Sequence, residues 1–374
     1  MTARPTRTAS RTPSRSSPAT AGPRPAAPAH PGHYAVVGAG IAGLACARTL
    51  LQAGHRVTLI ESQPQVGGRT ASLQTAYGSF DIGAQYFTVR DHRFNLALQT
   101  TPGLARPWSA SSVRVLDAAG KLAVAAPPPG EAHWVASPCM DALAQAWAVP
   151  LMQAGCVLTS TEVTQIEPDP LRPQGWQLRS RAPDGSTRTL AGFDGVLLSL
   201  PAAQTQALLS GCSRAPDWAQ VLADVHMAPC WSLMLAFAQA VRPDLVTLGP
   251  QWNAARSTHH RIAWLARESS KPGRSHVERW TVQASPAWSQ EHLHDEPARV
   301  QAKLTRAFAE LTGIHATPSF SQVHCWPHAQ TQTPLGQPFV WDQASGLGAC
   351  GDWCLGHRVE DAFISGLSLA MEVL

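Results

Sequence analysis

The sequence lacks several features that would place a protein of 374 residues in a common class. It has no uninterrupted apolar run of 18 residues, so a conventional membrane-spanning helix is excluded. Its eight cysteines include no C-x-x-C pair, which removes the usual zinc and redox-cysteine spacing. It has no G-x-S-x-G motif, which argues against a serine hydrolase. The histidines at 259–260, 292 and 294 lack companion ligands, and we expect no metal site.

Acidic residues are missing from the first 60 positions, and the charge is concentrated in a short segment. Residues 1–32 contain five arginines, seven prolines and no acid, and we predict a disordered tail there. The other 342 residues carry 29 − 5 = 24 basic and 25 acidic groups, a net charge of −1. A nearly neutral body argues against nucleic-acid binding. Cysteines in apolar contexts and the lack of a signal-peptide apolar region favour a cytoplasmic protein.

A glycine-rich loop follows directly after the tail. The pattern predicts a strand at 34–37, the loop G-A-G-I-A-G at 38–43, a helix to about 53 and a second strand at 56–60. This is a β-α-β unit with the dinucleotide-binding fingerprint G-x-G-x-x-G. Because the loop opens a helix, its free N–H groups and positive dipole end favour phosphates.

Each part of this loop has a chemical purpose. Gly38 permits the tight turn, Gly40 lets the backbone approach a pyrophosphate, and Gly43 lets helix and strand pack closely. Glu61 ends the second strand and suits both ribose hydroxyls, which argues against a 2′-phosphate there. The predicted cofactor-binding residues of the unit are Gly38, Gly40, Ile41, Ala42, Gly43, Glu61, Ser62, Gly67, Gly68 and Arg69, the last three for a second side of the pyrophosphate.

Strand and helix patterns alternate along the rest of the chain. Helices are expected at 138–154, from Asp295 as N-cap to Gly313, and from Val359 to the C-terminus. Strands are expected at 113–116 and 122–125 around a turn, at 156–167, at 195–200 and at 347–351. This order predicts an α/β protein into which more antiparallel, tryptophan-rich material is inserted.

Three motifs beyond the first glycine loop narrow the assignment. They are Gly67-Gly68-Arg69, the stretch Phe80-Asp81-Ile82-Gly83-Ala84-Gln85-Tyr86-Phe87-Thr88, and the final Gly351-Asp352-Trp353 with the residues up to Ala362. With the run from Trp264 to Arg274, they resemble the bacterial renalase-like branch of the flavin amine oxidase superfamily. The resemblance covers roughly residues 33–374.

The resemblance implies non-covalent FAD and further residues that contact it. Asp352 would bind a ribityl hydroxyl, and the helix from Val359, with Arg358, would stabilise negative charge on the reduced ring. Cys354 is expected to be a buried thiol and not an attachment point. The cofactor residues implied in this way are Ala84, Gln85, Val163, Gly351, Asp352, Arg358, Val359 and Ala362.

The same resemblance implies an α/β fold of two domains, a Rossmann-like FAD-binding domain of the glutathione reductase and amine oxidase type and an inserted α+β substrate domain. The FAD-binding domain would comprise residues 33–95, 156–215 and 320–374, and the substrate domain residues 96–155 and 216–319. Candidate substrate-pocket residues are those expected to reach the flavin face, with catalytic roles left unassigned: Gln85, Tyr86, Trp264, Trp280, His324 and Trp326. Five of the six have a plainer alternative: a core packing role for the three tryptophans and His324, and a local backbone hydrogen bond for Gln85.

The implied reaction is hydride transfer from a reduced small molecule to flavin N5, followed by reoxidation with O2 to H2O2. A dihydro-NAD(P) isomer is the first choice of substrate, because its ring nitrogen already pushes hydride out and no strong base is needed. A flavin-containing amine oxidase is the alternative, weakened because only three tyrosines and three lysines exist and no tyrosine lies in the C-terminal half. A third hypothesis is a protein that binds FAD without catalysing a reaction.

Overall fold

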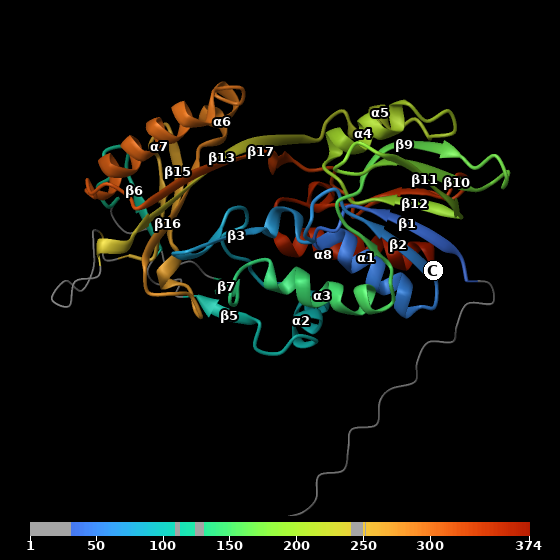
Figure 1. Cartoon of the computed structure of the whole chain (residues 1–374), viewed down its shortest axis with the longest axis horizontal. Coiled ribbons are helices and arrows are strands. Elements are labelled where there is room, and N and C mark those ends of the chain that lie inside the picture. Colours follow the sequence, from blue (N-terminus) through green and yellow to red (C-terminus); the bar gives the residue numbers. More distant parts are fainter. Residues whose placement is uncertain (1–30, 109–112, 124–130, 241–249, 251) are drawn as a thin grey trace, which may run out of the picture.

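The computed structural model describes residues 31–108, 113–123, 131–240, 250 and 252–374. They form two lobes joined by two long neighbouring strands, β13 (His226–Phe237) and β17 (Phe320–Thr333). Figure 1 shows β1, β2 and β12 in one lobe and β15, β16 and α7 in the other. The segment 1–30, for which we predicted disorder, lies outside the described residues.

The first lobe is built on a six-stranded sheet in the order β18-β19-β12-β1-β2-β8. All pairs are parallel except β18 with β19. The strands are β1 (His33–Val37), β2 (Arg56–Ile60), β8 (Val157–Leu158), β12 (Gly195–Leu198), β18 (Val340–Asp342) and β19 (Leu347–Ala349). The predicted α/β class and the first β-α-β unit are confirmed.

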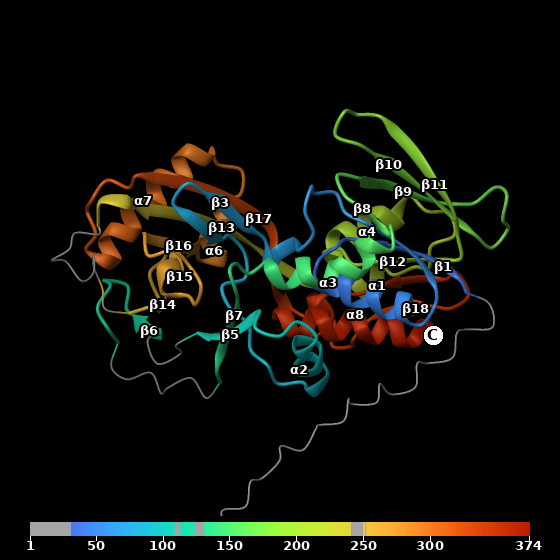
Figure 2. The ribbon, with the colours of Figure 1, turned by 60° about the horizontal axis from the view of Figure 1, so that its bottom comes forward.

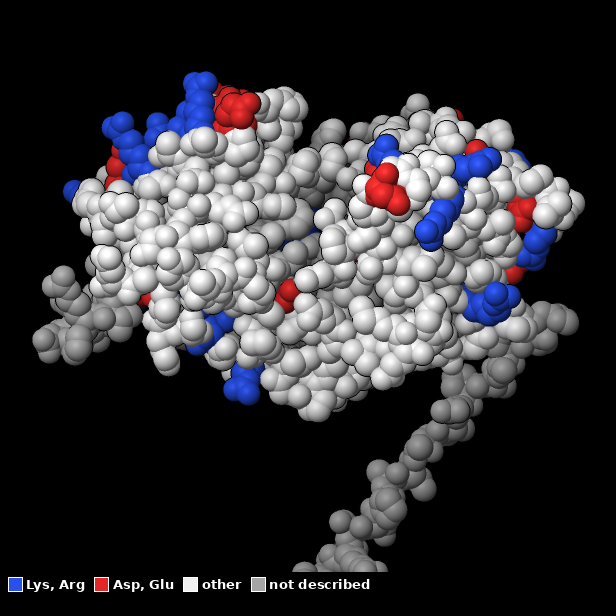
Figure 3. Space-filling model, viewed as in Figure 1, with Lys and Arg blue, Asp and Glu red and all other residues white. Residues whose placement is uncertain are grey.

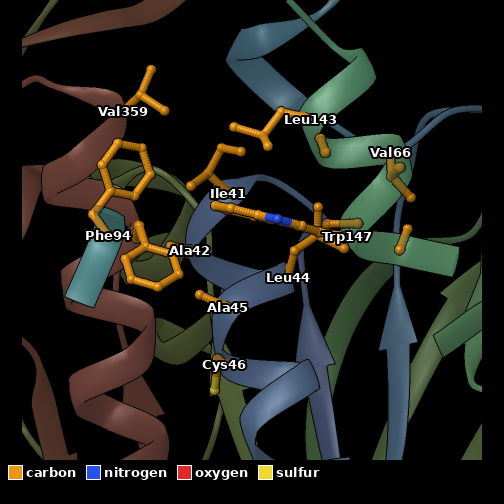
Figure 4. Close-up of a cluster of buried hydrophobic side chains, with 14 of the residues drawn as sticks. Ile41, Ala42, Leu44, Ala45, Cys46, Val66, Phe94, Leu143, Trp147 and Val359 are labelled. Atoms are coloured by element: carbon orange, nitrogen blue, oxygen red, sulfur yellow. The ribbon is translucent and has the colours of Figure 1, made fainter. Parts of the chain in front are cut away.

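Three helices cover one face of this sheet. They are α1 (Ile41–Gln52), α3 (Ala142–Gln153) and α8 (Val359–Val373), with α2 (His92–Gln99) beside α8. Figure 4 shows apolar side chains of α1 and α3 converging around Trp147, which is fully buried. Gly366 allows α8 to lie directly on α1, because a Cβ there would stand 2.0 Å from the Ala42 carbonyl oxygen. This contact fixes the C-terminal helix against the glycine loop.

The opposite face is covered by a three-stranded antiparallel sheet and two short helices. The strands are β9 (Glu162–Pro168), β10 (Trp176–Arg181) and β11 (Thr187–Phe193), and the helices are α4 (Ala202–Ser210) and α5 (Ala219–Leu222). The single long strand predicted at 156–167 is wrong, because the chain breaks at Ser160, which has a φ of 51°, and forms β8 and β9 in two different sheets.

The second lobe contains a six-stranded sheet in the order β17-β13-β16-β15-β14-β6. Its other strands are β6 (Val113–Leu116), β14 (Ala254–Ser257), β15 (Ile262–Arg267) and β16 (Glu278–Ala284). Helices α6 (Pro286–Glu291) and α7 (Pro297–Thr312) cover one face with a tryptophan-rich core. The helix predicted before Gly313 is α7, and its apolar face is buried. Its N-cap is Glu296 and not the predicted Asp295, whose carboxylate pairs with Lys303.

Two further pairs of antiparallel strands lie where the two lobes meet. β3 (Ser72–Thr75) and β4 (Gly78–Asp81) lie on the open face of the second sheet, where Phe80 packs on Met234. β5 (Ala105–Trp108) pairs with β7 (His133–Ala136), and Figure 2 shows this pair between the two lobes. No helix in the described residues is both long and apolar enough to cross a membrane.

Candidate functional site

The first glycine loop has the geometry of an open phosphate cradle. Gly38 has a φ of +98°, and a Cβ on Gly43 would stand 1.9 Å from the Gly38 carbonyl oxygen, so both positions require glycine. Gly40 is different, because its φ of −73° suits any residue and no heavy atom lies within 4 Å of the place where a Cβ would be. No described side chain caps α1 at Gly40. The backbone at Gly40, directly before the first residue of α1, is therefore open to a close approach.

Glu61 is tied to this loop by its own carboxylate. Oε2 accepts a hydrogen bond from Ala39 N at 2.8 Å, and Oε1 accepts from Gln63 N at 2.9 Å and from the Ser62 hydroxyl at 3.2 Å. The carboxylate is 7% exposed and keeps lone pairs for further donors. Ser62 opens onto a pocket of about 300 Å³, which Ser160, Glu162 and Arg181 also line. This pocket lies directly after β2, beside the residue that follows Glu61.

The second glycine pair packs directly on the first loop. Gly67 N donates to the Ala39 carbonyl oxygen at 2.9 Å, and a Cβ on Gly68 would stand 3.2 Å from the Gly40 Cα. Arg69 extends from this turn to Asp352, with hydrogen bonds of 2.9 and 2.5 Å, and to the carbonyl of Ala329 at 3.1 Å. Two predicted cofactor residues 283 positions apart are thus joined at one side of the cradle.

The remaining predicted cofactor residues lie around the same cradle. Gly351 and Asp352 begin a buried 3-10 turn after β19, and Arg358 is the N-cap of α8, followed by Val359 and Ala362. The Arg358 and His357 N–H groups both donate to Asp361 Oδ2, which therefore occupies part of the helix end. Val163 is buried on β9.

All eight cysteine thiols, which lie within the described ranges, are free. Cys354 is fully buried, and burial raises the pKa of its thiol.

The turn from Ile82 to Tyr86 connects the cofactor cradle to the second lobe. Ala84 N donates to the Arg69 carbonyl oxygen at 2.9 Å, so the turn rests on the Gly67-Gly68-Arg69 segment. Gln85 is buried, its amide nitrogen donates to the Asp81 and Gly83 carbonyls, and its oxygen accepts from Lys271 Nζ at 3.2 Å. The carboxamide of this candidate pocket residue therefore makes the local backbone hydrogen bonds that were its plainer alternative, and these bonds hold the turn.

A fully buried ionic cluster is hydrogen-bonded to this turn through the Gln85 side chain. Lys271 Nζ donates to Asp81 Oδ2 at 2.8 Å and to Glu268 Oε1 at 3.0 Å, and Arg274 donates to Asp81 Oδ2 at 2.7 Å. All four side chains have no exposed area. Burial alone would raise the pKa of Asp81, but Lys271 and Arg274 hold it below its ordinary value. Burial raises the pKa of Glu268, although Lys271 opposes the shift.

One face of the second sheet presents a continuous row of functional side chains to the turn. Direct cross-strand pairing connects five residues in the order Arg256, Trp264, Gln283, Ser232 and His324. Directly paired residues point to the same side of a sheet. Gln283 donates to the Gly83 carbonyl oxygen at 2.7 Å, and nearby Trp326 donates to that of Ile82 at 2.9 Å. The row therefore faces the turn, and His324 packs on Trp326 with ring centroids 4.4 Å apart.

An aromatic wall forms where this row meets Tyr86. The Tyr86 ring stacks on His133 at 4.0 Å and lies 5.5 Å from Trp264, centroid to centroid. His133 and Trp264 are 5% and 8% exposed, and His133 Nδ1 and Trp264 Nε1 have no hydrogen-bond partner in the described structure. Buried polar atoms are almost always paired, so an unpaired atom needs an explanation. Burial, aided by Arg256, lowers the pKa of His133.

Trp280 lies elsewhere. It has no exposed area, its Nε1 donates to Glu278, and its ring packs edge-on against Trp252 and Phe308 in the core beneath α7. Trp280 is therefore a residue of the hydrophobic core, which was the alternative to its place among the substrate-pocket candidates. His133 and Arg256 were not anticipated, since neither stands in a recognisable motif, and only the folded register brings them beside Tyr86.

No group of three or more potential metal ligands occurs among the described residues. Figure 3 shows a groove between the two lobes, on a face whose charged side chains gather mainly toward the two ends. A further pocket of about 400 Å³ lies where β13 and β17 meet α4, lined by His226, His328 and Gln332 among others.

Two protein-family models match the chain. Residues 36–97 match an NAD(P)-binding Rossmann-like domain, and residues 133–374 match the family described as flavin containing amine oxidoreductase. The second match covers more than half of the sequence.

Comparisons with individual proteins give short sequence matches and long structural ones. Putrescine oxidase of Kocuria rosea is 52% identical over 54 residues, 14% of this chain and 11% of that protein. An L-amino-acid oxidase of Siganus canaliculatus is 43% identical over 54 residues, 14% of this chain and 10% of that protein. The chain therefore matches only about a tenth of these curated relatives.

The solved structure of cyclohexylamine oxidase from Brevibacterium oxydans IH-35A superposes with a TM-score of 0.69 at 14% identity, covering 92% of this chain and 99% of that one. A putrescine oxidase structure gives 0.67 at 11% identity, with the same coverage. At these identities the likeness shows the fold.

Proposed function

Because this chain belongs to the family of flavin containing amine oxidoreductases, we propose that it is an oxidase that takes a hydride from a reduced small molecule. The substrate we favour is a dihydro-NAD(P) isomer, as in renalase-like enzymes. Molecular oxygen would accept the electrons and leave as H2O2. The observation that carries the proposal is the aromatic wall of Tyr86, His133 and Trp264 beside the turn that rests on Arg69.

FAD is the cofactor of this family, and the residues present fit it. The open space at Gly40 is a cradle that a side chain would fill, and the pocket at Ser62 lies at the nucleoside end of the glycine loop. When bound, FAD supplies the acceptor for a hydride. Glu61 would hold the ribose, the α1 N-terminus and Arg69 the pyrophosphate, and Asp352 a ribityl hydroxyl. We propose that the attachment is non-covalent, because the Cys354 thiol is buried.

The wall suits a substrate whose own electrons expel the hydride, because it supplies flat rings and no strong base. Flat rings of Tyr86 and Trp264 can hold a dihydropyridine by stacking, which fixes its orientation. The substrate's ring nitrogen expels the hydride, so the wall needs no strong base. Burial keeps the pKa of His133 below its ordinary value, and at neutral pH this side chain is an uncharged donor or acceptor for a ring substituent.

Oxidation of an amine is the alternative, favoured by the names of the relatives above. The described lysines weigh against the arrangement in which a lysine acts on the flavin through water. Lys271 is fully buried and engaged by Asp81, Glu268 and Gln85, and Lys303 pairs with Asp295 on α7. Lys121 lies in the turn after β6. Tyr86 is the one tyrosine of the three in the sequence that belongs to the wall.

Anaerobic reduction of the bound flavin tests the proposal. The yellow holoprotein is mixed with 6-dihydro-NAD, and the oxidised-flavin absorbance is followed, with ordinary 4-dihydro-NADH as the matched control. Rapid bleaching by the 6-isomer alone supports the proposed substrate. Bleaching by a panel of amines and not by the isomer replaces it with the amine oxidase alternative. Tightly bound FAD that no donor reduces indicates a non-catalytic flavin-binding protein.

A further inference from the structure

Arg256 stands at the exposed end of the aromatic wall. It lies on β14 directly opposite Trp264 of β15, so both side chains emerge on the face that looks toward Tyr86. Its Nη2 donates to the Tyr86 hydroxyl at 3.4 Å, and its side chain is exposed. Within the described ranges no acidic side chain forms an ion pair with it, and Glu131, which also acts on His133, is already paired with Arg90.

The wall combines one positive charge, on Arg256, with two buried polar nitrogen atoms that have no hydrogen-bond partner in the described structure. The Tyr86 ring is half-buried between His133 and Trp264, while His133 Nδ1 and Trp264 Nε1 are buried without partners among the described residues. An indole N–H can only donate, so the missing partner of Trp264 is an acceptor. A guanidinium beside it favours an acceptor that carries negative charge, and it repels a protonated amine.

We infer that the wall formed by Tyr86, His133, Trp264 and Arg256 is a subsite for a planar ring joined to an anionic group, with the ring on the aromatic faces and the anion at Arg256. The inference rests on the proposed function, because it assumes that the ring held there is the one oxidised. The anion is a carboxylate on the ring or a phosphate one sugar away. Either matches the planar fork of arginine, which binds both groups through paired N–H donors.

Matched ligand pairs separate these sources without any turnover. The oxidised holoprotein is titrated with nicotinamide mononucleotide against nicotinamide riboside, which differ by a phosphate. A second titration compares nicotinate with nicotinamide, which differ by a carboxylate. Binding is followed as the perturbation of the flavin absorption spectrum. We expect the anionic member of one pair to bind about 10-fold more tightly than its neutral partner, the size expected for a charge-assisted hydrogen bond at an exposed site.

Substitutions then assign this preference to Arg256. R256Q is expected to abolish the preference while leaving the affinity for the neutral ligand within about 2-fold, because only the interaction with the anion is lost. R306Q, on the exposed surface of α7, is the matched control and should keep the full preference. Y86F removes the hydroxyl that contacts Arg256 but keeps both the ring and the cation, so the preference for the anionic ligand should persist.

Two results overturn the inference: no preference in either ligand pair, or a preference that survives in R256Q. A preference that also falls with R306Q would be a general charge effect and would overturn it as well. Failure of the proposed function looks different, because amines would then bleach the flavin in the anaerobic assay whatever the outcome of these titrations. A preference that weakens when salt rises from about 10 mM to 500 mM supports an exposed guanidinium as its source.

Discussion

Replacing Lys271 by methionine removes the central cation of the buried cluster at almost constant side-chain length. The ammonium group has no exposed area and serves Asp81, Glu268 and Gln85 at 2.8, 3.0 and 3.2 Å. Asp81 retains Arg274, and Glu268 retains the Thr281 hydroxyl at 2.8 Å. Breaking a buried ion pair by removing one partner typically costs about 3–5 kcal/mol. We expect K271M to lower the free energy of unfolding by about that amount near pH 8.

The loss should depend on pH because Glu268 can accept a proton. Burial already raises the pKa of Glu268, and Lys271 is the largest opposing influence, so its removal raises the pKa further. A carboxyl group whose folded-state pKa exceeds its unfolded value binds the proton preferentially in the folded state. The stability it contributes is present at low pH and disappears as pH rises through the folded-state pKa. K271M should therefore lose less stability at pH 5.5 than at pH 8.

Urea unfolding of the apoproteins, followed by tryptophan fluorescence, measures both effects, because without FAD a change in cofactor affinity does not enter the free energy of unfolding. Lys303→Met is the matched control, because Lys303 forms a partly exposed pair with Asp295, and pairs of this kind contribute roughly 1 kcal/mol or less. A K271M loss below about 1 kcal/mol at pH 8 would refute the reasoning, because it would equal the exposed control. A loss that is the same at pH 5.5 and pH 8 would refute the role given to Glu268.

Three further predictions concern the cofactor cradle and its surroundings. G40A should change the free energy of unfolding of the apoprotein by no more than about 1 kcal/mol while weakening FAD binding. G43A should destabilise the apoprotein itself, because its Cβ would clash with the Gly38 carbonyl oxygen. Equal effects of the two substitutions on apoprotein stability would contradict the role given to Gly40. Burial lowers the pKa of His324 below 6.5, so the unfolded chain binds the proton first and stability falls as pH drops below 6.5. H324Q should flatten that fall, by at most about 1.4 kcal/mol per pH unit in urea titrations, and an unchanged slope would speak against it. Acid precipitation should leave all flavin in the supernatant, and yellow pellet protein would mean a covalent link.

The local parts of the fold could be predicted because their signals are local. The strand predicted at 34–37, the helix predicted to about 53 and the strand predicted at 56–60 follow from apolar periodicity and glycine positions. The structure confirms all three elements, at His33–Val37, Ile41–Gln52 and Arg56–Ile60. The split of 156–167 could not be foreseen, because the alternating pattern continues across Ser160 while the backbone changes sheet there. The domain boundaries at 95, 155, 215 and 320 stay predictions.

The cofactor side of the site was more predictable than the substrate side for a physical reason. A phosphate cradle needs backbone approach, which only glycine permits, so its residues leave a mark in the sequence. The wall needs only rings and a cation, which many positions supply. Its members Tyr86, His133 and Arg256 come from three separate segments, and the β14–β15 register that places Arg256 opposite Trp264 is a long-range property.

The turn that contains Gln85 connects the cofactor-binding residues to the aromatic wall. The sequence made Gln85 a candidate pocket residue with a local backbone hydrogen bond as the plainer alternative; its nitrogen donates to the Asp81 and Gly83 carbonyls, and its oxygen accepts from Lys271. The adjacent residue Ala84 is hydrogen-bonded to the Arg69 segment, and Tyr86 on the other side belongs to the wall. A shift of this turn would therefore displace the cradle and the wall together. We expect K271M to weaken both FAD binding and ligand-pair discrimination, whereas R256Q should affect discrimination alone.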